Sequence, residues 1–340
     1  MGLRDNPVAM VVGHVICILF AALPVQLFYF VGKPYKRGFF CDDESLRHPY
    51  HESTVTSTVL YIYGFGLPIL TFIIVEILNV RLGQPNLEPQ FEKPFLRYRV
   101  PSFIQNIYQN TWPFLLGATI QQMVTDIAKY TTGRLRPHFI AVCNPQYLDE
   151  LCKLPYKYIV DFECNTKYTE KHLKEMRLSF PSGHSSFSMF CMLWIILYLE
   201  KRLTVPCVML QAGKVILQSL FFYIAWFTAM SRVSDYKHHW SDVLSGMLIG
   251  SVTCAVVFTK IAPISNIKFY SCSVRQDQDP SEPLEQIQQG NGETQYIAIH
   301  RQQHQQAHPQ HQQLRLHTNY QDHEDRLSVE PLERNHSVPA

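Results

Sequence analysis

The sequence predicts an all-α membrane protein with six transmembrane helices and a disordered C-terminal tail. Only 17% of the 340 residues are charged, whereas soluble globular domains carry about 25%. Long uncharged runs recur up to Pro263, and roughly 20 apolar residues in helical form cross a bilayer core of about 30 Å. Beyond Pro263 the chain becomes polar. We therefore expect two parts, a six-span domain over residues 1–263 and a tail over residues 264–340.

The first three spans are expected near residues 8–32, 55–80 and 103–128. The first has no formal charge, is too long for the apolar part of a signal peptide and lacks a small-residue cleavage site, so we expect it to be retained. The second is interrupted only by Glu76, near its end. The third contains seven Asn, Gln and Asp side chains, which in a membrane bundle would face the interior. A soluble amphipathic helix is the alternative for this third segment.

The last three spans are expected near residues 185–200, 214–230 and 243–262. The uncharged part of the fourth covers only about 22 Å as a helix, so it needs extension at both ends to cross. Charged residues bound the other two, namely Lys214, Arg232, Asp242 and Lys260.

Six spans place both termini on one side and the loops 129–184 and 231–242 on the other. Short loops on the terminal side hold seven basic residues and the opposite ones six, which favours cytosolic termini only weakly. Four cysteines fall in the opposite loops, where an oxidising compartment would allow disulfides. They are Cys41, Cys143, Cys152 and Cys164, and the sequence leaves their pairing open.

The charge balance and the tail exclude some classes of function. Residues 1–263 carry a net charge of +6 and the tail −4, giving +2 overall, so no basic surface predicts nucleic-acid binding. The tail is rich in Gln and His, a composition that cannot bury a core and is typical of disorder. Its seven histidines are spaced irregularly, which disfavours the alternative of a metal-binding segment.

Three short motifs adjoin the predicted spans on the same side of the membrane. The first runs from Lys129 to Arg136-Pro137, the second is Pro181-Ser-Gly-His184, and the third runs from Ser231-Arg232 to Asp242. Each alone is also explained by basic residues at a membrane interface with a turn or a helix cap. Together they bring hydrogen-bond donors for an anion, and also two histidines, to the same face of the membrane domain.

The cations of these motifs suit a phosphate group. Lys129, Arg136 and Arg232 supply positive charge, and arginine matches paired phosphate oxygens. Ser182 and Gly183 open a predicted helix, whose free N–H groups and positive dipole end bind anions.

The two histidines suit phosphoryl transfer. His238 and Asp242 are four residues apart, a spacing that on a helix brings a carboxylate within reach of an imidazole. One histidine would attack phosphorus while the other, His184, protonates the leaving alkoxide. Three fixed cations already balance the phosphate, so we expect neither a metal nor another cofactor.

The pattern K-x6-RP, PSGH and SR-x5-H-x3-D resembles that of the animal lipid phosphate phosphatases, the type 2 phosphatidate phosphatases. The segment from Arg37 to Ser45 is also similar to that family, and the resemblance spans residues 1–263. It implies a six-helix membrane enzyme of phospholipid metabolism and lipid signalling, with its site outside the cell or in an organelle lumen. We expect a plasma-membrane protein with cytosolic termini, and a homo-oligomer is compatible with the sequence.

The resemblance also implies roles for individual residues. His238 would be the nucleophile that forms a phosphohistidine, His184 the acid for the leaving group, and Asp242 the residue that orients His238. The phosphate would be held by Lys129, Arg136, Ser182, Gly183 and Arg232. The substrates would be phosphatidate, lysophosphatidate, sphingosine 1-phosphate and ceramide 1-phosphate.

Three other functions compete with this interpretation. A non-catalytic lipid-binding relative is disfavoured because every motif position is intact. A transporter or channel is suggested by the polar third span but does not require the Arg, His and Asp residues on one face. A polyprenyl diphosphatase would share the six-span layout, but the extended third motif and the segment 37–45 disfavour it.

Overall fold

The computed structural model describes residues 6–82, 100–154, 156–203 and 208–266, and all of them belong to a single compact unit. Most of the tail predicted to be disordered, residues 267–340, lies outside the described residues. Its first residues belong to the short 3-10 helix η3 (Pro263–Asn266), where Ile264 is fully buried in the bundle core.

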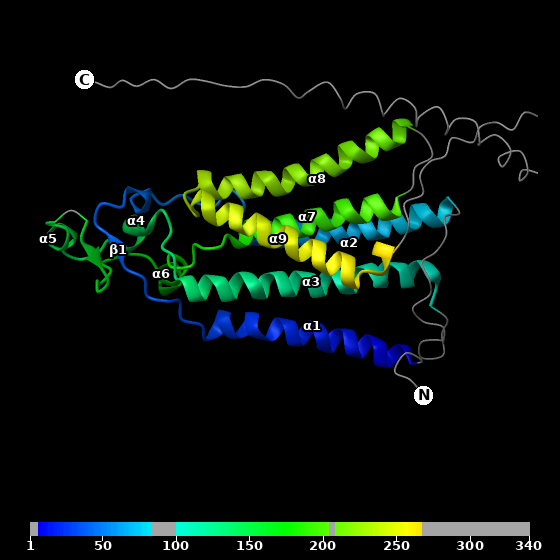
Figure 1. The fold of residues 1–340 in the computed structure, drawn as a ribbon, viewed down its shortest axis with the longest axis horizontal. Helices are drawn as coiled ribbons and strands as arrows, with labels where there is room; N and C mark the ends of the chain where they lie inside the picture. Colours follow the sequence, from blue (N-terminus) through cyan, green and yellow to red (C-terminus); the bar gives the residue numbers. More distant parts are fainter. Residues whose placement is uncertain (1–5, 83–99, 155, 204–207, 267–340) are drawn as a thin grey trace, which may run out of the picture. The chain divides into compact units, whose positions relative to one another are not determined.

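Six long helices lie side by side, and each overlaps one predicted span (Figure 1). They are α1 (Pro7–Phe30), α2 (Ser57–Arg81), α3 (Ser102–Thr132), α7 (Gly183–Arg202), α8 (Val208–Ser234) and α9 (Trp240–Ile261). Among the described residues, α1, α2, α8 and α9 are long and apolar enough to cross a membrane. The chain is thus a mostly helical membrane protein, and the number of six spans stays a prediction.

Helix α7 is the centre of the bundle. It packs against α2, α3, α8 and α9, whereas α1 packs against α3. Aromatic rings fill the space between these helices: Phe114 meets Trp194 at 5.7 Å between ring centroids, and Phe72 meets Tyr198 at 4.7 Å. Such tilted and edge-to-face pairs add to the stabilisation from burial alone.

Two glycines bring α9 into close contact with α7. A Cβ at Gly246 would lie 2.5 Å from the Ser182 carbonyl oxygen, and one at Gly250 would lie 2.2 Å from that of Ser186. Small residues spaced four apart form one stripe of a helix and allow backbones to approach. This stripe aligns the beginnings of α7 and α9.

The polar residues of α2, α3 and α7 turn inward. Glu76 is fully buried, and its two carboxylate oxygens accept from Arg202 Nε and Nη2 at 2.7 and 2.8 Å. Asn106 and Tyr198 also donate to Glu76, at 3.0 and 3.1 Å. Interior polar contacts of this kind explain why α3 and α7 are only weakly apolar in composition.

A small cap covers the end of the bundle where α7 begins (Figure 1). It contains η2 (Glu44–Leu46), α4 (Phe139–Cys143), α5 (Leu148–Leu151), α6 (Glu170–Glu175) and a two-stranded antiparallel sheet of β1 (Phe39–Phe40) and β2 (Tyr158–Ile159). Disulfides join Cys41 to Cys152 and Cys143 to Cys164. The four cysteines expected to lie in loops on one side therefore all pair within the cap.

Replacing Gly250 by leucine should separate α9 from α7, because the new side chain would overlap the Ser186 carbonyl. We expect a loss of roughly 2 kcal/mol or more in stability, typical of overpacking, and at least a tenfold fall in activity. Thermal unfolding in detergent measures the first effect, and hydrolysis of a lipid phosphate, the activity that the sequence resemblance implies, measures the second. Gly213→Leu is the matched control, since nothing lies within 4 Å of a Cβ there; an equal loss in both variants would contradict the close-packing argument.

Candidate active site

The first motif begins in the last turn of α3. Gly133 ends this helix with φ of 55°, and a Cβ there would lie 2.1 Å from the Tyr35 carbonyl oxygen, so only glycine fits. The chain then runs beside the residues ahead of α7: Arg136 N–H donates to Met176 O at 2.8 Å and Ser179 N–H donates to Arg134 O at 3.0 Å. The loop of the first motif is thereby attached to the segment leading into the second.

The second motif forms the beginning of α7. Ser182 is the N-cap, and its hydroxyl oxygen accepts from Ser185 N–H at 3.4 Å. A Cβ at Gly183 would lie 2.7 Å from Lys129 Nζ, which shows that the ammonium group reaches the start of α7. A side chain at this position would push the ammonium group away from the start of α7.

The third motif connects α8 to α9. Lys237 and His238 donate their backbone N–H groups to the Arg232 carbonyl oxygen at 3.0 and 3.1 Å. Ser182 N–H donates to the Asp242 carbonyl oxygen at 3.0 Å. All three motifs therefore meet at the capped end of the bundle, where α3 and α8 end and α7 and α9 begin (Figure 1).

Three buried nitrogen atoms of this site have no hydrogen-bond partner among the residues that the structure describes. They are Arg136 Nε, Arg232 Nε and His184 Nε2, from three different motifs. Buried polar groups are nearly always hydrogen-bonded, and those that are not require an explanation. An anion that accepts from both guanidinium groups and contacts the imidazole would supply the missing partners.

The predicted nucleophile is held by a backbone carbonyl. His238 is buried, and its Nδ1 lies 2.7 Å from Ser179 O. A carbonyl only accepts, so Nδ1 carries the hydrogen and Nε2 keeps its lone pair. Burial lowers the pKa of His238 to about 3; Arg136 and Lys129 add to this shift, while Asp242 opposes it. The imidazole is therefore neutral at physiological pH.

Asp242 lies within ion-pair distance of His238, as the helical spacing suggested, but too far away for a hydrogen bond. Its Oδ2 lies 3.9 Å from His238 Nδ1, because α9 begins at Trp240 and His238 precedes the N-cap residue His239. Asp242 occupies the third position of the helix and accepts from the His239 N–H at 3.1 Å, completing a capping box. A carboxylate at this position normally caps the helix start.

Two residues that the sequence analysis did not single out bind the Asp242 carboxylate. Arg134 Nη1 forms an ion pair with Oδ1, and the Ser179 hydroxyl donates to Oδ2 at 2.6 Å. Arg134 lies inside the first motif and Ser179 lies two residues before the second. The closeness of both residues to the motifs in the sequence was a signal that they belong to the site. That both bind the Asp242 carboxylate is seen only in the folded structure.

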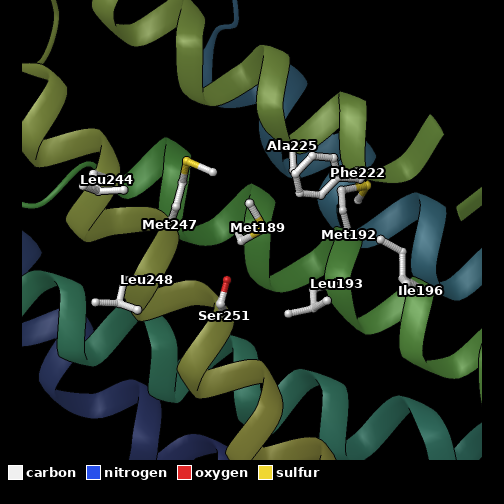
Figure 2. Close-up of a pocket in the computed structure, with 10 residues that line it drawn as sticks. All are labelled: Met189, Met192, Leu193, Ile196, Phe222, Ala225, Leu244, Met247, Leu248 and Ser251. Carbon is white, nitrogen blue, oxygen red and sulfur yellow. The ribbon is translucent and has the colours of Figure 1, made fainter. Parts of the chain in front are cut away.

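An apolar groove of about 340 Å³ lies between α7, α8 and α9, and Figure 2 shows its lining. Its residues are Met189, Met192, Leu193, Ile196, Phe222, Ala225, Leu244, Met247, Leu248 and Ser251. Leu244 and Leu248 are more than half exposed, so the groove opens on the outer surface of the bundle. These are the three helices whose ends carry the second and third motifs.

The structure gathers the predicted site residues at the capped end. Backbone hydrogen bonds join Ser182 to Asp242 and His238 to Arg232. The ammonium group of Lys129 reaches Gly183. The positive charges of Arg136, Arg232 and Lys129 act on His184. No group of three His, Cys, Asp or Glu side chains among the described residues is arranged to hold a metal ion.

Comparisons with known proteins identify related chains. Residues 110–264 match the family model described as the PAP2 superfamily. The chain is 45% identical over 281 residues to a Drosophila melanogaster protein named "Putative phosphatidate phosphatase", covering 78% of this chain and 73% of the relative. It is 41% identical to rat (Rattus norvegicus) phospholipid phosphatase 1, and the match covers 73% of this chain and 83% of the relative. It is 37% identical to human (Homo sapiens) phospholipid phosphatase 2, and that match covers 73% of this chain and 81% of the relative. No solved structure matches.

Acid should destabilise the fold through two buried histidines. Burial lowers the pKa of His138 to about 3, with Arg136 and Lys237 contributing, and His238 shifts similarly. Between pH 7 and pH 5 the unfolded chain takes up a proton at each position that the folded chain does not. The unfolding free energy should therefore fall by about 2 kcal/mol per imidazole.

Thermal unfolding in detergent against pH measures this dependence. His138→Gln should remove about half of the loss between pH 7 and pH 5, whereas His51→Gln, at an exposed position of the same cap, should retain it. An unchanged slope in His138→Gln would show that this imidazole is not held neutral.

Proposed function

The chain belongs to the lipid phosphate phosphatase family and is a membrane-bound phosphatidate phosphatase, and we propose that its reaction takes place where the three motifs meet. The observation that supports this location best is the trio of unpartnered buried nitrogens on Arg136, His184 and Arg232. They point to a site built for an anion with several oxygens, which a phosphate monoester provides.

The phosphate is held by cations and by the start of α7. Arg136 and Arg232 donate through their guanidinium groups, and Lys129 contributes an ammonium group beside Gly183. The Ser182 cap leaves first-turn N–H groups of α7 free for the phosphate oxygens. The developing negative charge of the transition state is thus met by donors already in place.

The first chemical step forms a phosphohistidine. His238 Nε2 attacks phosphorus with its lone pair, and a bond forms between nitrogen and phosphorus. The ester bond between phosphorus and the lipid oxygen breaks, and that oxygen takes a proton from His184. The lipid alcohol leaves, and the imidazole of His238 becomes positively charged.

The second step releases phosphate. A water molecule attacks phosphorus and gives a proton to His184, which the first step left neutral. The bond between nitrogen and phosphorus breaks, and its electrons return to His238 Nε2. Inorganic phosphate leaves, and both histidines regain their starting protonation.

Asp242 acts on His238 through Ser179. The serine carbonyl holds His238 Nδ1–H, and the serine hydroxyl donates to Asp242 Oδ2. The carboxylate charge, 3.9 Å from Nδ1, stabilises the charged imidazole of the intermediate. Asp242 thereby orients the nucleophile by fixing the residue that contacts it.

The substrates are lipid phosphate monoesters, including phosphatidate, lysophosphatidate, sphingosine 1-phosphate and ceramide 1-phosphate. The apolar groove between α7, α8 and α9 is open to the side and offers methionine, leucine and phenylalanine side chains to an acyl chain (Figure 2). A lysophosphatidate molecule taken from water gains about 0.8 kcal/mol for each methylene that enters the groove, whereas a chain already in the bilayer gains only packing contacts. The groove has no charged lining residue.

The protein spans the membrane six times, with the site on the outer face of the plasma membrane and the termini in the cytosol. Interior polar contacts such as Glu76 with Arg202 allow the weakly apolar α3 and α7 to cross. The two disulfides lie in the cap beside the site, and disulfides persist in oxidising compartments. No metal ion is required, because the chain's own cations balance the phosphate.

The two histidines should fail in different ways when replaced. His238→Ala should abolish turnover and any acid-labile phosphoenzyme. His184→Ala should slow formation of that intermediate by roughly 100-fold for a lipid alcohol, and by much less for p-nitrophenyl phosphate, whose leaving group needs no proton. Rapid-quench labelling with radioactive substrate in excess EDTA measures both effects.

The control for these variants is His51→Ala, at an exposed position of the cap, which should behave as the unmodified protein does. A phosphoenzyme in His238→Ala, or equal losses for both leaving groups in His184→Ala, would reverse the assigned roles. Activity lost in EDTA and restored by magnesium would contradict metal independence.

Filling the groove should reduce the use of long-chain substrates only. Ser251→Phe places a ring among the lining side chains, and we expect kcat/KM for a long-chain lysophosphatidate to fall by roughly tenfold, the equivalent of about two buried methylenes. Hydrolysis of p-nitrophenyl phosphate should change less than twofold. Val252→Phe, on an exposed face of the same helix, is the control. Parallel losses for both substrates would argue against an acyl-chain groove.

A further inference from the structure

Asp235 is a buried carboxylate beside the phosphate site that no role assigned above uses. It directly follows α8, whose last residue is Ser234, and is only 7% exposed. Arg232 Nη2 forms an ion pair with its Oδ2 atom. Arg232 is itself buried, and its Nε has no hydrogen-bond partner in the described part of the chain. One side of the guanidinium group is therefore held by the carboxylate and another is open to a ligand.

The loop between α1 and α2 (residues 31–56), called the first outer loop below, holds Asp235 in turn. Thr54 donates its backbone N–H to Oδ2 at 2.8 Å and its hydroxyl to Oδ1 at 2.7 Å. The carboxylate thus accepts from three groups, and both of its oxygens are engaged. A buried carboxylate with this many donors has a fixed orientation.

We propose that Asp235 is a positioning residue for phosphoryl transfer, which holds the Arg232 guanidinium group in the orientation that binds phosphate and is itself held by Thr54. The inference rests on the proposed phosphate-binding role of Arg232. A guanidinium group binds phosphate with a fixed set of N–H directions, so its orientation decides how many hydrogen bonds it makes. Asp235 also offsets the repulsion between Arg232 and the nearby charge of Arg136.

Further contacts fix the same segment against the first outer loop. The rings of His48 and Tyr236 stack at 4.3 Å with an interplanar angle of 8°, and Lys237 Nζ lies 3.7 Å from the ring centroid of Tyr50. Tyr236 has φ of 53°, a conformation that needs such support in a residue other than glycine. The first outer loop is thereby part of the framework of the phosphate site.

Inhibition by orthovanadate, an analogue of the five-coordinate transition state, tests the proposal. Asp235→Asn keeps the shape of the side chain but removes its charge and one acceptor. We expect the inhibition constant of vanadate to rise at least tenfold and kcat/KM to fall in parallel. Thr54→Val keeps the backbone donor and should give a smaller rise, of two- to fourfold. Asp149→Asn, at an exposed position of the cap, should change neither value.

A double-substitution cycle separates positioning from general destabilisation. In an Arg232→Lys background, Asp235→Asn should change the vanadate constant less than twofold, because the group it positions is gone. An equal rise in both backgrounds, or an unchanged constant in the single variant, would overturn the proposal. If Asp235→Asn does not fold, the same cycle is measured with Thr54→Val, whose smaller rise in the vanadate constant should likewise disappear in the Arg232→Lys background. An Arg232→Lys variant with unaltered vanadate binding would instead reject the phosphate role of Arg232 and this inference with it.

Discussion

The carboxylate of Asp242 is fully buried at the start of α9, where each of its oxygens must find a donor inside the protein. The donors come from separate parts of the chain: Arg134 after α3, Ser179 before α7, and His239 at the N-cap of α9. Removing one partner would leave a buried charge uncompensated, which is costly. One carboxylate thus connects the three segments that carry the motifs, and the geometry of the site depends on it.

The bundle brings these segments into register by close packing. Gly246 and Gly250 let α9 lie directly on α7, so Ser182 at the start of α7 lies against the first turns of α9 and its N–H donates to Asp242 O. At the other end of α7, the buried pair of Glu76 and Arg202 joins it to α2. A helix fixed at both ends against its neighbours holds its first turn, and therefore Ser182 and Gly183, in one place.

The sequence was sufficient for the long helices and for the motif residues, because uncharged runs and short fixed spacings are local signals. It was insufficient where the partner of a residue is decided by the fold. The spacing of His238 and Asp242 suggested that the two side chains lie near each other, which the 3.9 Å ion pair bears out, but it did not show that the helix begins after His238 and that the carboxylate caps His239. Ser179 and Asp235 carried no local signal of their roles, since Asp242 and Thr54 reach them only through tertiary packing. The pairing of the four cap cysteines was open for the same reason.

The charge distribution explains how a neutral nucleophile can operate among cations. Burial, with Arg136 and Lys129, keeps His238 unprotonated, so its lone pair is available for attack. The same cations would oppose a proton on any nearby imidazole until a phosphate dianion enters and offsets them. In the proposed mechanism, binding of the substrate therefore raises the proton affinity of His184, the proposed proton donor, before the lipid oxygen leaves.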